Sequence, residues 1–233
     1  MHPLDGVMKP RAFAVFDTLA PLATQHGFYL IGGTALATHL HHRMSTDLDF
    51  FLHVDFTPDD VEREILDCGM SYVVTSNEAN TVNLVCEGVP VQFLADPSQR
   101  QVEDPTRMGP ALVAGVADIC AMKLKVLLDR AKLRDYYDLM VIETVAPIPI
   151  EHGLQLVVER FDPTVPEQTL SEIVRALGYL GDVEDDPTVP IDRSELEAFW
   201  ARRQPEIVEH LTRSAPQGPF LLGGEAREKF RDL

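Results

Sequence analysis

The sequence is poor in the residues that mark several common classes of protein. Its 233 residues include three cysteines, Cys68, Cys86 and Cys120, and no CxxC pair. An odd number of scattered cysteines argues against a disulfide framework or a zinc site, so we expect reduced core thiols and a cytoplasmic protein. The longest apolar runs fall far short of the roughly 20 residues of a membrane span. The N-terminal stretch MHPLDGVMKPRAF lacks the basic and apolar regions of a signal peptide.

Positive charge is also scarce. The chain has 20 Lys and Arg against 37 Asp and Glu, which gives a formal net charge of −17. Proteins that hold nucleic acid along its backbone usually carry a basic face. Any contact with nucleic acid or nucleotide must therefore be local, made by a few placed cations or through a divalent metal. The hydrophobic content of 45% is enough for one large domain or two small ones.

Helical and strand patterns alternate in the first half of the chain. The apolar spacing and turn signals predict helices over residues 11–26, 35–43 and 58–68, and strands over residues 28–31, 46–54, 71–76, 81–88 and 89–96. Thr34 and Thr57 are suited to be the N-caps of the second and third helices. The EGVP segment between the last two strands has the composition of a hairpin turn.

The second half of the chain reads as helical. Residues 96–110 break the earlier pattern with three prolines and many polar residues, so we place a domain boundary there. Helices are expected over residues 115–132, 134–143, 166–180 and 192–211, the last one kinked or split near Pro205. The predicted fold class is α+β, with a mixed-sheet domain over residues 1–105 and a mainly helical domain over residues 106–233.

Two carboxylates lie one residue apart in the strand pattern TDLDFFLHV. Residues i and i+2 of a strand point to one face, so Asp47 and Asp49 would share a face with their side chains about 7 Å apart. That spacing suits two ligands of one divalent cation, and an oxygen-only donor set favours Mg²⁺ or Mn²⁺ over zinc. The alternative is a strand with two solvent-facing acids, which is common in antiparallel sheets.

A diglycine follows the preceding strand. Gly32 and Gly33, with Thr34 after them, join a short strand to a helix. Glycines allow the backbone to approach an anion closely, and the free N–H groups of a helix start bind phosphate. A tight strand-to-helix turn without a ligand is the plain alternative. A phosphate site beside a pair of metal-binding carboxylates would indicate nucleotide chemistry.

These motifs resemble a known family. GGT followed by DLD matches the hG[GS]…Dh[DE]h signature of the DNA polymerase β-like nucleotidyltransferases. The longer string IGGTALATHLHHRMSTDLDFF resembles the AbiEii-type toxins of that superfamily, which include the mycobacterial MenT enzymes. Downstream, MKLKVLLDRAKLRDYYDL and IVRALGYLGDVEDDP are similar to later segments of the family, in the same order.

The resemblance implies a minimal nucleotidyltransferase domain followed by a helical domain that closes the cleft. It implies metal-dependent transfer of a nucleoside monophosphate from an NTP to an acceptor hydroxyl, by a toxin of a toxin–antitoxin or phage-defence pair. A tRNA is an expected acceptor and a cognate antitoxin an expected partner. The residues that the resemblance assigns to the active centre are Asp47, Asp49, Lys123 and Asp138, with Gly32, Gly33, Thr34, Arg43, Ser45 and Arg130 at the nucleotide.

Several of these residues have plainer interpretations. Lys123 and Arg130 are seven residues apart, so on one long helix they would lie on the same face, two turns from each other. On an ordinary amphipathic helix, two such cations would simply be exposed to solvent. Arg130 would alternatively pair with Asp135 or Asp138, and Asp135 sits where an acid favours a helix start. The nearby histidines are better explained as surface or helix-end residues than as metal ligands: His39, His41 and His42.

One position departs from the polymerase β-like pattern. Many of these enzymes carry a third carboxylate on a neighbouring strand, whereas Gln92 occupies that position here. An amide binds Mg²⁺ more weakly than a carboxylate. The number of metals therefore stays open, and so do two rival functions: a small-molecule transferase of the aminoglycoside type, and a catalytically silent member that binds nucleotide or a partner protein.

Overall fold

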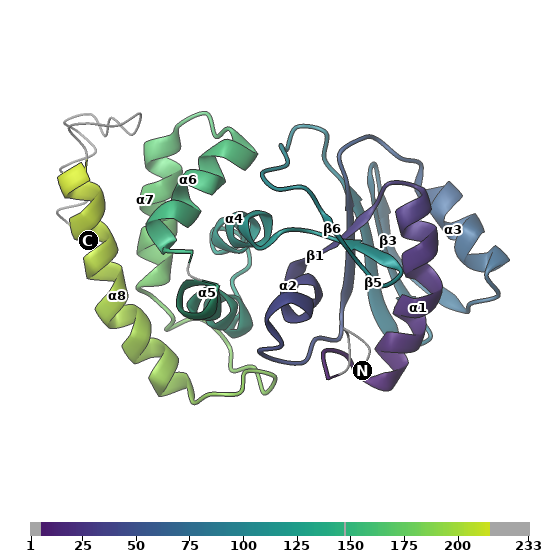
Figure 1. Ribbon diagram of the computed structural model, residues 1–233, viewed down its shortest axis with the longest axis horizontal. Coiled ribbons are helices and arrows are strands. Elements are labelled where there is room, and N and C mark those ends of the chain that lie inside the picture. Colours follow the sequence, from purple (N-terminus) through teal and green to yellow (C-terminus); the bar gives the residue numbers. More distant parts are fainter. Residues whose placement is uncertain (1–5, 147, 215–233) are drawn as a thin grey trace. The chain divides into compact units, whose positions relative to one another are not determined.

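The computed structural model describes residues 6–146 and 148–214 (Figure 1). The chain divides into two compact units, one up to Ile119 and one from Cys120 onward. The first unit holds the sheet, and the second is helical in its described part. The predicted α+β class, with a mixed sheet followed by helices, is confirmed.

A seven-stranded mixed sheet forms the centre of the first unit, in the order β3-β4-β5-β2-β1-β7-β6. Strand β2 lies in the middle, antiparallel to β1 and parallel to β5, while β1 runs parallel to β7. The strands are β1 (Tyr29–Ile31), β2 (Leu48–Leu52), β3 (Tyr72–Glu78), β4 (Thr81–Cys86), β5 (Val89–Ala95), β6 (Thr106–Met108) and β7 (Ala111–Val113).

Helices cover both faces of this sheet. Figure 1 shows α1 (Pro10–Gln25) and α3 (Pro58–Asp67) on one face and α2 (Gly32–Leu40) on the other. The face under α1 and α3 is the apolar one. Alternate residues of the central strands are buried there, and the rings of Phe50 and Phe93 stack with centroids 5.0 Å apart. The face on the side of α2 carries Asp49 and Gln92, which are only partly buried.

The predicted hairpin between β4 and β5 is confirmed. These strands are antiparallel and joined by Glu87 and Gly88, both with positive φ (51° and 80°). Two consecutive residues of this kind form the tight turn that matches the twist of a two-stranded ribbon.

Residues 96–110 are less irregular than their composition predicts. They include β6 and most of the turn into β7, and both strands belong to the sheet of the first unit. The buried Asp118 carboxylate accepts hydrogen bonds from the backbone N–H groups of Val102 and Glu103, at 3.1 and 2.8 Å. These bonds hold the loop around Val102 and Glu103 in place. The boundary between the two compact units lies after Ile119, whereas the sequence patterns predicted a domain boundary after residue 105.

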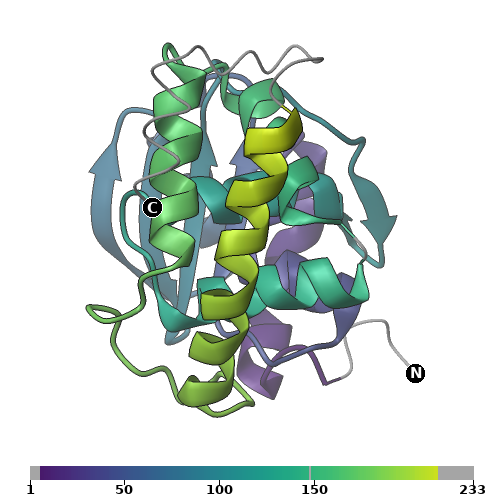
Figure 2. The same ribbon diagram turned by 90° about the vertical axis from the view of Figure 1, so that its left-hand side faces the viewer.

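The second unit packs its helices around Trp200. This buried side chain donates from its indole N–H to the carbonyl of Tyr136, whose own hydroxyl bonds the carbonyls of Ala176 and Tyr179. The helices are α4 (Val116–Val126), which begins in the first unit, α5 (Leu133–Val145), α6 (Ile150–Phe161), α7 (Pro166–Leu177) and α8 (Arg193–Ser214). Figure 2 shows α8 as the long helix nearest the viewer, and Pro205 lies inside it as predicted.

Two expectations for this half were wrong. The structure contains α6, which the sequence patterns did not indicate, and α4 ends at Val126 instead of running to residue 132. Arg130 therefore lies beyond the helix that was expected to present it beside Lys123, and it is exposed.

The cysteines are all free thiols, as expected. Cys86 and Cys120 are buried, and burial raises the pKa of each thiol, to about 11 and about 12. Cys68 was expected in the core, but it is exposed at the end of α3.

No single helix within residues 6–146 and 148–214 has both the length and the apolar character needed to cross a membrane. Helices α5 and α6 meet that criterion only as a pair, across a bend of 114°.

Candidate active site

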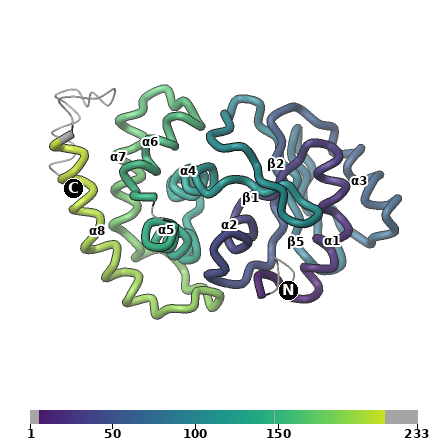
Figure 3. The backbone as a smooth tube through the Cα atoms, viewed as in Figure 1, coloured from purple at the N-terminus to yellow at the C-terminus, as the bar shows by residue number. Residues whose placement is uncertain are grey.

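Asp49 lies at the centre of the sheet. In the register of β2, it is opposite Ile31 on β1 and beside Gln92 on β5. Ile31 is the last residue of β1, and the chain turns from it directly into α2. The strand pairing therefore brings Asp49 to the point where α2 begins; Figure 3 traces the chain from β1 through α2 and back into β2.

The Asp49 carboxylate contacts the first residue of α2. Gly32 has φ +71°, and a Cβ built on it would lie 2.6 Å from Oδ2 of Asp49. Only glycine fits here, because both the backbone conformation and the space exclude a side chain. The start of a helix carries partial positive charge and free N–H groups, so it stabilises a carboxylate placed there.

Gly33 provides a second close approach. A Cβ on Gly33 would lie 2.5 Å from Nη2 of Arg43 and 3.5 Å from Oγ of Ser45. Arg43 and Ser45 are both buried, although both are polar. The two glycines thus bring a carboxylate, a guanidinium and a hydroxyl against the first turn of one helix.

Thr34 does not cap α2, contrary to expectation. The helix begins at Gly32 with Ile31 as its N-cap, and no side chain caps it. The Thr34 hydroxyl instead donates to the backbone carbonyl of Asp47 at 2.5 Å. This bond ties the segment before β2 to α2, and Thr46 donates a further hydrogen bond to Oδ1 of Asp47 at 3.1 Å.

Gln92 belongs to a polar row across the sheet. Its amide N–H donates to Oδ1 of Asn83 at 2.7 Å, and the Asn83 amide donates to Oγ of Ser76 at 2.7 Å. With Asp49 beside Gln92, the row crosses four strands on one face. The sequence patterns did not indicate a role for Asn83 or Ser76. Asn83 could have been noticed as a polar residue within the otherwise apolar strand TVNLVC.

The side chains of Asp47, Asp49 and Gln92 fit a hard divalent cation in chemical type. Asp47 and Asp49 offer carboxylate oxygens, Gln92 offers an amide oxygen, and none of the three offers sulfur. Within the described residues, no group of three or more His, Cys, Asp or Glu side chains gathers at metal-binding distance. Asp47 and Asp49 therefore have no third carboxylate or imidazole gathered with them in the described part of the chain.

Lys123, Asp135 and Asp138 form a buried cluster in the second unit. The Lys123 ammonium lies 2.6 Å from Oδ1 of Asp135 and 2.8 Å from Oδ2 of Asp138. Burial lowers the pKa of Lys123, but Asp138 and Asp135 more than offset it, so the pKa is raised above its ordinary value. Asp135 also accepts the backbone N–H of Lys132 at 3.0 Å, so it both caps α5 and pairs with Lys123.

The histidines after the diglycine have structural contacts. Nε2 of His39 lies 2.8 Å from the carbonyl oxygen of Ala114 at the end of β7. His41 is the C-cap of α2 in the left-handed conformation. These positions agree with the helix-end interpretation.

Part of the first unit matches a known family. Residues 15–84, which include the diglycine turn and both aspartates, match the family described as the nucleotidyl transferase AbiEii toxin of type IV toxin–antitoxin systems. Over this segment the chain is therefore similar to the AbiEii nucleotidyl transferases. An uncharacterized protein of Aquifex aeolicus is 25% identical over 214 residues, 87% of this chain and 98% of its own length.

A solved structure with a related description was also found. MenT4, a nucleotidyltransferase toxin of Mycobacterium tuberculosis H37Rv, aligns over 98% of this chain and 90% of its own, at 16% identity and a TM-score of 0.44. The AbiEii match over residues 15–84 confirms the resemblance expected from the GGT and DLD motifs.

Replacing Gly32 with alanine should cost more stability than replacing Gly69. Both residues have positive φ (71° and 73°), which costs a non-glycine residue about 1–2 kcal/mol. Gly69 has open space around it, whereas a Cβ at Gly32 meets Asp49. Urea unfolding of Gly32→Ala and Gly69→Ala measures the difference, and equal losses would show that Asp49 moves aside without cost.

Replacing Lys123 with methionine should destabilise the protein by about 3–5 kcal/mol, because two buried carboxylates lose their cation. The charge-matched control is Lys125→Met, whose lysine is less buried and lies in the same helix. Adding Asp138→Asn to Lys123→Met should recover part of the loss. Chemical denaturation monitored by circular dichroism tests this, and a change within about 0.5 kcal/mol would contradict the buried ion cluster.

Proposed function

We propose that the protein transfers a nucleoside monophosphate from an NTP to an acceptor hydroxyl, at a site built on the start of α2. The observation that carries the proposal is the contact of Asp49 with Gly32, next to that of Gly33 with Arg43. It gathers a carboxylate, a guanidinium and helix N–H groups, the set of groups that a metal-bound triphosphate requires.

In this proposal Asp47 and Asp49 hold the divalent cation, Mg²⁺ or Mn²⁺. When bound, the metal supplies positive charge that neutralises the phosphate oxygens during in-line displacement. Asp49 lies within β2 and is fixed by the strand register, while Asp47 precedes the strand and is held through Thr34 and Thr46.

The diglycine turn has the binding role. The N-terminal N–H groups of α2 would donate to a phosphate, and the space that the two glycines leave brings Asp49 and Arg43 close to the same turn. The guanidinium of Arg43 is a planar fork that suits phosphate oxygens. Ser45 adds a hydroxyl next to it, within reach of the same turn.

Lys123 and Asp138 enter the proposal as active-centre residues of the helical unit. A buried lysine held by two carboxylates is costly compared with an apolar core, which favours a functional reason for keeping it. Asp138 is fully buried and would orient the ammonium. Arg130, exposed beyond α4, remains proposed only as a cation at the nucleotide.

The acceptor that we propose is tRNA, with the protein acting as the toxin of a toxin–antitoxin pair and an antitoxin as its partner. The AbiEii match supports the toxin role. The net charge of −17 argues against broad contact with RNA, so recognition would be confined to a short end of the acceptor. The same charge favours a second candidate, a small basic acceptor of the aminoglycoside type.

Asp49→Asn should abolish labelling of the acceptor while the protein stays folded. The protein is incubated with each α-³²P-labelled NTP, Mg²⁺ or Mn²⁺, and either total tRNA or an aminoglycoside panel. Label on tRNA supports the toxin role, and label only on the aminoglycosides supports the second candidate. The control is Asp67→Asn, an exposed acid at the end of α3, which should label like the wild type.

No labelling with any NTP or acceptor, combined with retained NTP binding, would overturn the transferase proposal. It would favour the silent nucleotide-binding member. Lys123→Met and Asp138→Asn, assayed at a temperature where circular dichroism shows them folded, extend the test to the helical unit.

Gln92→Glu should tighten Mn²⁺ binding in the presence of a non-hydrolysable NTP analogue, because it adds a carboxylate beside Asp49. Electron paramagnetic resonance of free Mn²⁺ measures the affinity without any need for turnover. Asp49→Asn should weaken it. If Gln92→Glu leaves the affinity unchanged, position 92 does not face the metal site.

A further inference from the structure

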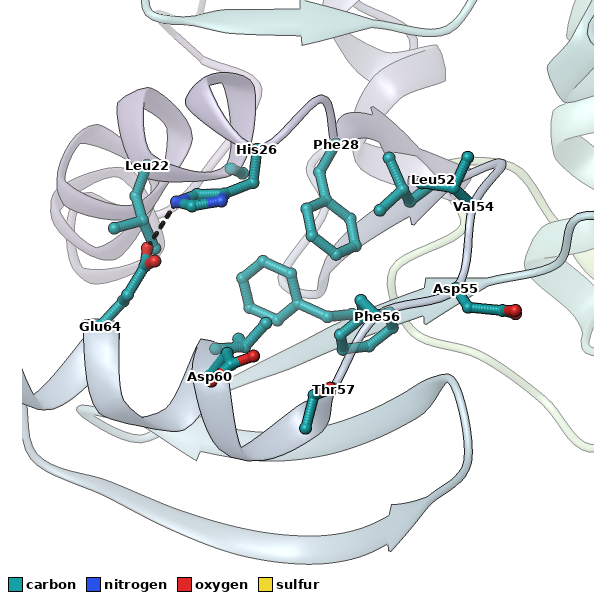
Figure 4. A pocket seen from close by; sticks show the side chains of 13 residues that line it. Leu22, His26, Phe28, Leu52, Val54, Asp55, Phe56, Thr57, Asp60 and Glu64 are labelled. Carbon is teal, nitrogen blue, oxygen red and sulfur yellow. Dashed lines mark ion pairs between the residues drawn. The ribbon is translucent and has the colours of Figure 1, made fainter.

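The first unit has a hollow on the sheet face opposite Asp49. A cavity of about 330 Å³ lies where the end of α1, the end of β2, the following loop and α3 come together (Figure 4). This volume is at the lower end of the range for small-molecule sites. Thirteen residues line it. They include Leu22 of α1, His26 directly after that helix, and Val61 and Glu64 of α3.

The floor of the cavity is aromatic. The ring of Phe28 makes edge-to-face contacts with Phe56 and with Phe93, each with centroids 5.2 Å apart and the planes about perpendicular. Leu52 and Val61 extend the apolar surface. Rings fixed in this way offer a preformed apolar surface, which costs a ligand little ordering of the protein.

The rim of the cavity is acidic. It carries Asp55, Asp60 and Glu64, and none of the thirteen lining side chains is Lys or Arg. Nε2 of His26 contacts Oε2 of Glu64 at 2.8 Å, and the two side chains point toward each other in Figure 4.

Two of the rim acids have other partners. Asp60 pairs with the exposed Arg63 at 3.0 Å, and Asp55 accepts a hydrogen bond from Asn80 at 2.6 Å. An exposed pair such as Asp60 with Arg63 is weak and is readily exchanged for another cation. Asp60 and Glu64 thus place carboxylates at the edge of the cavity, beside its apolar floor.

We propose that this cavity binds a small organic amine. The apolar body of the ligand packs on Phe28 and Phe56, and its ammonium lies at Glu64 with Asp60 beside it. Burial of the body against the rings supplies most of the affinity. The carboxylates supply selectivity for a cation over a neutral or anionic molecule of the same shape.

The amine site is separate from the proposed nucleotide site. Phe93 lines the cavity on one face of β5, and the preceding residue, Gln92, lies on the opposite face beside Asp49. Binding of the amine should therefore not require metal, NTP or transfer, and Asp49→Asn should bind it as the wild type does. The amine-binding proposal can therefore fail while the transferase proposal stands, and the transferase proposal can fail while the amine-binding proposal stands.

The test uses 4-phenylbutylamine, 4-phenylbutanol and 4-phenylbutyrate, which share an apolar body and differ in charge. Titration calorimetry at low salt should give the tightest binding for the amine and the weakest for the acid. Glu64→Gln should weaken amine binding by about two- to five-fold and leave the alcohol unchanged. Glu64→Lys should reverse the order, so that the acid binds better than the amine.

Asp59→Asn is the matched control. Asp59 is an exposed acid in the first turn of α3 that does not line the cavity, so its loss removes the same charge without touching the site. Its amine affinity should equal that of the wild type. Equal binding of amine and acid, absence of amine binding, or equal effects of Asp59→Asn and Glu64→Gln would overturn the proposal.

Discussion

The contact between the Asp49 carboxylate and Gly32 is the constraint on which the proposed site depends. It needs a residue without a side chain at position 32, a strand that turns directly into a helix, and the antiparallel register that sets Ile31 opposite Asp49. A one-residue slip of β2 would move Asp49 to the face under α1 and α3. The apolar residues Leu48 and Phe50, both buried on that face, fix the register against such a slip.

Negative charge is abundant in this chain, and the structure compensates it locally. Asp49 meets the start of α2, Asp118 accepts two backbone N–H groups, and Asp135 and Asp138 share Lys123. Each of these arrangements acts within a few ångströms, where screening by salt is weak. A net charge of −17 is therefore compatible with phosphate chemistry, because local groups, not the sum over the chain, decide what a site binds.

The sequence predicted the parts of the fold that local patterns govern. The strand patterns gave β1 to β5 but not β6 and β7, which fall in and directly after the proline-rich stretch 96–110, and the diglycine and the two aspartates stood at recognisable positions. Helix α6 was missed because Gly153 weakens its helical pattern; a Cβ there would lie 2.8 Å from both Cys120 and Leu124, so close packing on α4 requires glycine. The end of α4 at Val126, which removed Arg130 from the helix, has no breaker residue in the sequence. The backbone after Val126 continues in tighter turns, in which Leu127 and Leu128 donate to the carbonyls three residues earlier.

Asp49 and Asp47 are positioned by different parts of the first unit. Beneath Asp49, on the other face, Phe50 stacks on Phe93, and Phe28 packs against Phe93 in turn. These rings restrain β2 and β5 together, so Asp49 and Gln92 are carried on a rigid base. Asp47 precedes β2 and is held by hydrogen bonds from Thr34 and Thr46. In the proposed site, the strand register therefore positions Asp49, and hydrogen bonds from threonine hydroxyls position Asp47.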